Sequence, residues 1–204
     1  VALGTSLVVT GLTLTAGRAG DLYGRKRVYL LGWAILTLGL TAASFAQSLE
    51  QLIAMRLIQA VGVSFAIANA NAIVTDAFPD HERGRALGTI TAVVGAGLMS
   101  GPIFGGFVLE FTDWRGIFYA RIPIGLLAIA MGVFEIREEF REREVNRRLD
   151  IPGAVLLFVA LSATLVAVNR GQSWGWMSPS ILGLAAFGIA TGALFVLVES
   201  RAVS

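Results

Sequence analysis

Long stretches without a charged residue place the strongest constraint on how this chain folds. Seven such stretches divide its 204 residues, and most reach the roughly 20 residues that a helix needs to cross about 30 Å of hydrocarbon. Strict alternation of apolar and polar residues is absent, which argues against a β-barrel. We therefore predict an all-α membrane protein with seven transmembrane helices, at 1–17, 28–46, 57–75, 86–109, 122–134, 151–169 and 171–198.

The composition agrees with a membrane protein and argues against several other classes. Hydrophobic residues make up 55% of the chain and charged residues 15%, against roughly 25% charged residues in soluble domains. The chain has no cysteine and one histidine, His81, so we expect no disulfide, metal site or cofactor. No nucleophile–base pair is recognisable, so we do not expect an enzyme. The net charge of +2 gives no reason to expect nucleic acid as a partner.

Basic residues gather in alternate loops, and this sets the expected orientation. Twelve of the sixteen Lys and Arg residues follow the first, third, fifth and seventh predicted spans. The positive-inside rule places these loops in the cytoplasm, so the first residue lies outside and the last inside. The chain begins with Val1 and shows no signal peptide, and we expect it to start partway through a longer protein.

A run of charged residues divides the chain into two groups of spans. Glu139/Arg143 and Glu144/Arg148 are spaced four residues apart, as in a solvated helix or linker. We predict a charged cytoplasmic linker at 137–150, between a five-span bundle at 1–136 and two further helices at 151–204.

The turn after the first predicted span combines glycines with charges at regular spacing. Glycines allow a tight turn, and a carboxylate is favoured near the start of the next helix and beside basic residues. The spacing is too regular for an ordinary basic loop. The residues that we single out are Gly17, Gly20, Asp21, Gly24, Arg25 and Lys26.

One arginine lies within a span. Arg56, Gln59 and Gly62 fall close to one face of the third predicted helix. A charge there costs roughly 2.5–3.5 kcal/mol on insertion scales and usually has a function, although Arg56 could instead reach the outer interface. Asn69 and Asn71 point in different directions, so at most one lines a given cavity. Either could instead bond a neighbouring helix.

The fourth predicted span concentrates glycine and proline. Three of its glycines stand four residues apart and form a stripe of small residues that lets another helix approach closely. A proline within the stripe removes a backbone donor and kinks the helix. The sequence predicts a bent, closely packed helix with Gly88, Gly97, Gly101, Pro102, Gly105 and Gly106 as its key positions.

Together these residues resemble the major facilitator superfamily, and within it the fourteen-span drug:proton antiporters. The turn at 17–27 is similar to the signature loop between helices two and three, and residues 56–62 to an element of helix four. The pattern at 88–106 matches the antiporter motif of helix five in every fixed position. The resemblance implies a gating loop at the turn, proton coupling at Arg56, Gln59 and Gly62, and helices two to eight for this segment.

The chain departs from the family pattern at four positions. Ala60 replaces the first glycine of the helix-four element, and Ala19 stands in the signature loop where leucine is usual. Leu22 replaces a basic residue of that loop, and Arg121 stands where the branch commonly has asparagine. The two changes in the loop could weaken gating contacts.

The function implied by the resemblance is proton-coupled export of lipophilic or amphipathic compounds by alternating access. The expected partners are a small-molecule substrate, protons and the bilayer of the plasma membrane, with a monomeric full-length protein. No nucleotide-binding loop is present, so ATP hydrolysis by this chain is not the expected energy source. The alternatives are a metabolite or ion carrier on the same scaffold and, from another class, a seven-helix receptor or channel subunit.

Overall fold

The computed structural model describes residues 2–136 and 151–202, and these form helices joined by short turns. Six of the helices, all except α1, are long and apolar enough to cross a membrane. α1 carries four threonines, and its last turns hold Arg18 and Asp21, so its crossing remains a prediction. The all-α fold and the number of helices agree with the sequence. The helices are α1 (Ala2–Tyr23), α2 (Arg25–Ser44), α3 (Leu49–Ala77), α4 (Asp80–Phe111), α5 (Gly116–Glu135), α6 (Ile151–Trp174) and α7 (Pro179–Ala202).

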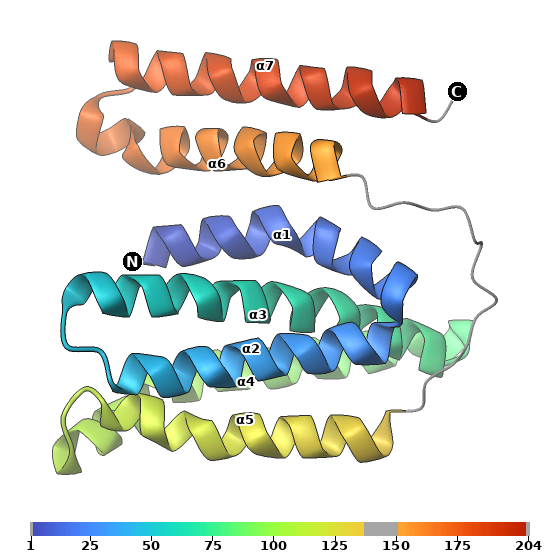
Figure 1. Ribbon diagram of the computed structural model, residues 1–204, viewed down its shortest axis with the longest axis vertical. Helices are drawn as coiled ribbons and strands as arrows, with labels where there is room; N and C mark the ends of the chain where they lie inside the picture. Colours follow the sequence, from blue (N-terminus) through green and yellow to red (C-terminus); the bar gives the residue numbers. More distant parts are fainter. Residues whose placement is uncertain (1, 137–150, 203–204) are drawn as a thin grey trace.

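Successive helices run in opposite directions, across the view from left to right and back (Figure 1). The α1–α2 and α3–α4 turns share one end of the molecule, while the α2–α3, α4–α5 and α6–α7 turns share the other. The first two basic loops therefore lie at the same end, as the charge pattern predicts. The linker predicted at 137–150, with its two pairs of charges, lies outside the described residues.

Several helices extend past the charges that bound the predicted spans. The Ser48 side chain caps α3 by accepting a hydrogen bond from the Gln51 N–H at 3.3 Å. Arg56 therefore lies two turns inside α3 rather than in its first turn. α6 continues through Arg170, whose guanidinium lies 5.5 Å from the Trp174 ring centre. A charge that stacks on an interfacial aromatic ring does not end a helix.

The closest helix contact joins α2 to α3, and two glycines make it possible. A Cβ atom added to Gly62 would lie 2.5 Å from the Leu36 amide nitrogen, and one added to Gly32 would lie 2.6 Å from the Ala66 nitrogen. The two backbones therefore touch. A small apolar cluster of Leu40, Ala43 and Phe118 extends this contact to α5.

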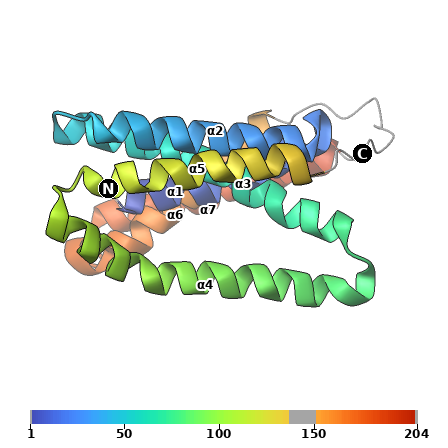
Figure 2. The same cartoon turned by 90° about the horizontal axis from the view of Figure 1, so that it is seen from below.

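α4 stands apart from the other helices along most of its length (Figure 2). Pro102 lies inside it without ending it, and no residue of α4 is buried. A Cβ atom added at Gly97, Gly101 or Gly105 would meet no described atom within 4 Å. The close approach predicted for this stripe is therefore not made by any helix in the described part of the chain, because no neighbouring helix reaches its surface.

The absence of cysteine makes the orientation directly testable. Met177 lies in the α6–α7 turn and is 85% exposed, and His81 is exposed at the start of α4 near the opposite end. We expect Met177→Cys in intact cells to react with a membrane-impermeant maleimide, and His81→Cys to react only after permeabilisation. The unsubstituted chain is the control. Labelling of His81→Cys alone in intact cells would reverse the orientation.

Candidate functional site

The turn between α1 and α2 is built around one glycine. Gly24 has a φ of 99°, a conformation that side chains rarely allow, and it forms the N-cap of α2. Its N–H donates to the Gly20 carbonyl at 2.9 Å, and its own carbonyl accepts from the Val28 N–H at 3.1 Å. The chain therefore reverses within one residue, which places the charges on both sides of the turn next to each other.

Arg25 joins three helices at this end. Its Nε and Nη2 atoms lie 3.1 and 3.0 Å from the Asp21 carboxylate on α1. Its Nη1 atom binds the Asp76 carboxylate of α3 and donates to the Ala72 carbonyl at 3.0 Å. Lys26 adds a fourth helix, because its Nζ donates to the Val133 carbonyl of α5 at 2.7 Å. Asp76 was not among the residues selected from the sequence. An acid directly after the third predicted span, at the start of a basic loop, was the available signal.

The two carboxylates bound by Arg25 are expected to differ in importance. The Asp76 side chain is 29% exposed and that of Asp21 58%. Because water screens the more exposed pair more strongly, Asp76→Asn is expected to lower the stability in detergent by about 1–2 kcal/mol, and Asp21→Asn by less than about 1 kcal/mol. Thermal unfolding followed by tryptophan fluorescence measures both. Equal losses would contradict this ranking.

Gly20 and Asn69 meet where α1 crosses α3. A Cβ atom at Gly20 would lie 1.7 Å from the Asn69 Oδ1, so only glycine fits there. The buried Asn69 donates from Nδ2 to the Ala16 carbonyl at 3.1 Å and to the Phe65 carbonyl at 2.8 Å. It bonds the neighbouring helix and lines neither of the cavities described below. Asn71 is exposed, and Gly17 has open space around it.

Arg56, Gln59 and Gly62 hold α2, α3 and α5 together, toward the end of the molecule opposite the α1–α2 turn. The Arg56 guanidinium lies 5.0 Å from the Phe118 ring centre, a cation–π distance. The buried Gln59 donates from Nε2 to the Gly39 carbonyl at 3.0 Å. With Gly62 against Leu36, the three residues selected from the sequence all face neighbouring helices rather than lipid.

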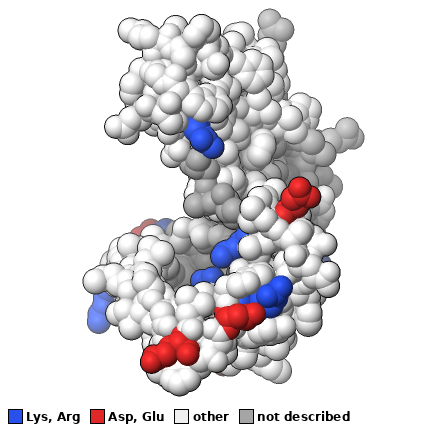
Figure 3. Space-filling view, turned by 90° about the vertical axis from the view of Figure 1, so that its left-hand side faces the viewer, with Lys and Arg blue, Asp and Glu red and all other residues white. Residues whose placement is uncertain are grey.

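A cavity of about 640 Å³ adjoins Arg56 and Gln59. Figure 3 shows this end of the molecule, with basic side chains inside a hollow. Its volume falls in the range of small-molecule sites, roughly 300–1,000 Å³. The walls come from α1, α2, α3 and α5 and comprise Thr5, Ser6, Val9, Thr10, Trp33, Leu36, Leu40, Arg56, Gln59, Ala60, Val63, Arg121, Ile124 and Gly125.

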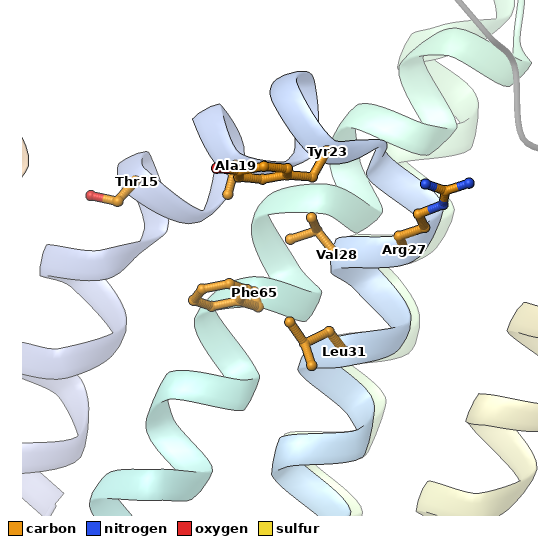
Figure 4. A pocket seen from close by; sticks show the side chains of 7 residues that line it. All are labelled: Thr15, Ala19, Tyr23, Arg27, Val28, Leu31 and Phe65. Carbon is orange, nitrogen blue, oxygen red and sulfur yellow. The ribbon is translucent and has the colours of Figure 1, made fainter. Parts of the chain in front are cut away.

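A second cavity, of about 530 Å³, lies near the α1–α2 turn and is more apolar (Figure 4). Ala19 forms part of its wall, where the family usually has the larger leucine. Tyr23 of α1 lies across this space from Leu31 of α2 and Phe65 of α3. Arg27 also lines this cavity, with its guanidinium directed away from Tyr23 and Phe65.

Comparison with known proteins places most of this chain in one family. The model of the Major Facilitator Superfamily matches residues 1–151. The chain is 42% identical to the riboflavin transporter RibZ of Clostridioides difficile, over 80% of this chain and 36% of the relative. It is 35% identical to the multidrug resistance protein Stp of Mycobacterium tuberculosis, over 96% of this chain and 36% of the relative. It is 32% identical to multidrug resistance protein 3 of Bacillus subtilis, over 91% of this chain and 36% of the relative. The chain thus spans a little more than a third of these relatives.

Proposed function

This chain belongs to the major facilitator superfamily of membrane transporters, and from that premise we propose that the protein is a proton-coupled exporter of lipophilic or amphipathic small molecules. Members of the family carry small-molecule substrates across a membrane and are not enzymes. The relatives named for multidrug resistance support export. Alternating access is part of the proposal, with two halves of the full-length protein that rock around a central site.

The observation that carries the proposal is the position of Arg56 in the wall of the 640 Å³ cavity. An arginine stays charged at any physiological pH, so Arg56 cannot itself carry the proton. A fixed positive charge favours the ionised form of a nearby acid and lets that acid take up a proton when the two separate. If a helix carrying the acid moves relative to α3, each change between the inward-open and outward-open states also changes the proton affinity of that acid.

The contacts around Arg25 support a gating role for the α1–α2 turn. Arg25 and Lys26 together bind groups on α1, α3 and α5, so these contacts hold the helix ends to the turn as long as they are formed. The Arg25–Asp21 pair is partly exposed, and water can replace it at moderate cost. We propose that contacts of this kind break and re-form as the cytoplasmic side of the transporter opens and closes.

Transport into everted membrane vesicles tests the proposal. The full-length protein is expressed, and a fluorescent cationic dye such as ethidium is added outside the vesicles under an imposed proton gradient, acid inside. Accumulation that collapses when a protonophore is added supports proton-coupled export. Accumulation that persists after the protonophore, or that equals accumulation in vesicles lacking the protein, would contradict it.

A metabolite carrier is the second candidate, because one of the relatives is named as a riboflavin transporter. Labelled riboflavin added to cells expressing the full-length protein separates the two functions. Riboflavin transport without dye export would favour a metabolite carrier, whereas dye export without riboflavin transport would favour the exporter.

A further inference from the structure

The cavity beside Arg56 contains a second arginine, Arg121, and we propose that these two guanidinium groups bind the anionic group of an amphipathic substrate. The proposal rests on the transport function proposed above and adds to its substrates a class of amphipathic organic anions that carry a carboxylate or phosphate. Arg121 is also the residue for which the family resemblance offered no role.

The charge of the cavity is the first argument. Arg56 and Arg121 are its two charged wall residues, and both are positive. Arg56 lies two turns after the start of α3, and Arg121 lies in the second turn of α5, at the same end of the molecule. Within the described residues, neither guanidinium has a carboxylate at ion-pair distance, although Arg25, Arg83 and Arg115 each do.

The number of charges is the second argument. Two positive charges in one cavity repel each other, and removing both from water is costly without compensating anions. The coupling mechanism proposed above supplies one acid beside Arg56. This acid does not compensate the charge of the second guanidinium, and an anionic group on the substrate would do so. Guanidinium groups bind carboxylate and phosphate oxygens in a fork geometry, so such a site selects by charge and by shape.

The remaining wall residues fit an amphipathic anion. Thr5, Ser6 and Thr10 supply hydroxyl groups. Trp33 also belongs to the wall, and its buried indole N–H forms no hydrogen bond within the described part of the chain. The aliphatic wall residues Leu36, Leu40, Val63 and Ile124, from α2, α3 and α5, offer a surface for an apolar tail.

Equilibrium binding tests the proposal without requiring proton coupling. The probes are a BODIPY-labelled dodecanoate and its methyl ester, which share their apolar part and differ in charge. Binding to the purified full-length protein is followed by fluorescence anisotropy. Arg121→Gln is expected to weaken dodecanoate binding at least about tenfold relative to the ester, and Arg121→Lys to weaken it less. Arg170→Gln, which removes a charge outside the cavity, is the matched control.

Each result supports or overturns the proposal. Selective loss of dodecanoate binding in Arg121→Gln supports it. Equal effects on both probes, or none on either, would overturn it and point to a carboxylate elsewhere in the protein as the partner of Arg121. Ester binding without dodecanoate binding in the unsubstituted protein would overturn it as well. The ethidium assay reads the proposed export separately, so failure of the anion site and failure of proton-coupled export are distinguishable.

Discussion

Replacing Gly62 with leucine is expected to reduce strongly the amount of folded protein in the membrane. The hydrogen at this position already faces the backbone of α2, where an added Cβ would lie 2.5 Å from the Leu36 nitrogen and 2.6 Å from the Gly32 carbonyl oxygen. Overpacking a core typically costs about 1–3 kcal/mol when side chains can adjust. Here the obstacle is backbone, so α2 and α3 must separate along their whole contact, and the cost exceeds that range.

The matched control is Gly95→Leu in α4. A Cβ atom at Gly95 meets no described atom within 4 Å, so this change adds the same side chain to a helix glycine without a clash. We expect near-normal amounts of Gly95→Leu protein in the membrane, and a strongly reduced amount of Gly62→Leu protein with a lower melting temperature. Similar amounts and melting temperatures for the two variants would show that α2 and α3 do not touch at Gly62.

The glycines of α2, α3 and α4 show how far helix packing can be predicted from the sequence. The small-residue stripe at Gly97, Gly101 and Gly105 was predicted to allow close packing, yet it faces open space in the described part of the chain. The closest contact instead uses Gly32 and Gly62. Spacing shows that a helix permits a close neighbour, but which neighbour arrives depends on the packing of the whole bundle.

The positions of the helices were more predictable than their contacts. The length of an apolar run is a local property, and the bilayer sets the length required, so the sequence alone indicates where helices lie. The errors occur at the ends. A charge was taken as a boundary, but Arg170 lies inside α6 and stacks on Trp174. A long side chain can carry its charge to the interface while its backbone remains helical.

The candidate site was predictable to the extent that its residues break a local rule. Arg56 stands out as a charge in an apolar run, and Gly24 as a glycine in a tight turn, which its positive φ explains. Asp76 could not be singled out in the same way, because an acid at the end of a helix is unremarkable in sequence. Its role appears when the fold brings it to Arg25, fifty-one residues away.

Arg56→Ala is expected to uncouple export from the proton gradient while leaving the protein in the membrane. The change removes a charge that costs roughly 2.5–3.5 kcal/mol to insert, so it does not oppose insertion. It also removes the fixed charge that we propose controls the protonation of a partner acid. In everted vesicles containing the full-length protein, we expect ethidium accumulation driven by an imposed pH gradient to fall at least about tenfold.

Two further variants separate coupling from a general effect of losing an arginine. Arg56→Lys keeps the charge but loses the planar fork, so it should restore part of the pH-driven accumulation. Arg170→Ala removes a guanidinium that also stacks on an aromatic ring, at 5.5 Å from Trp174 against 5.0 Å for Arg56 from Phe118, but it lies outside the cavity. It should export normally. If Arg56→Ala exports at the normal rate with normal pH dependence, then its guanidinium only reaches the interface and stacks on Phe118, and the proton is coupled elsewhere.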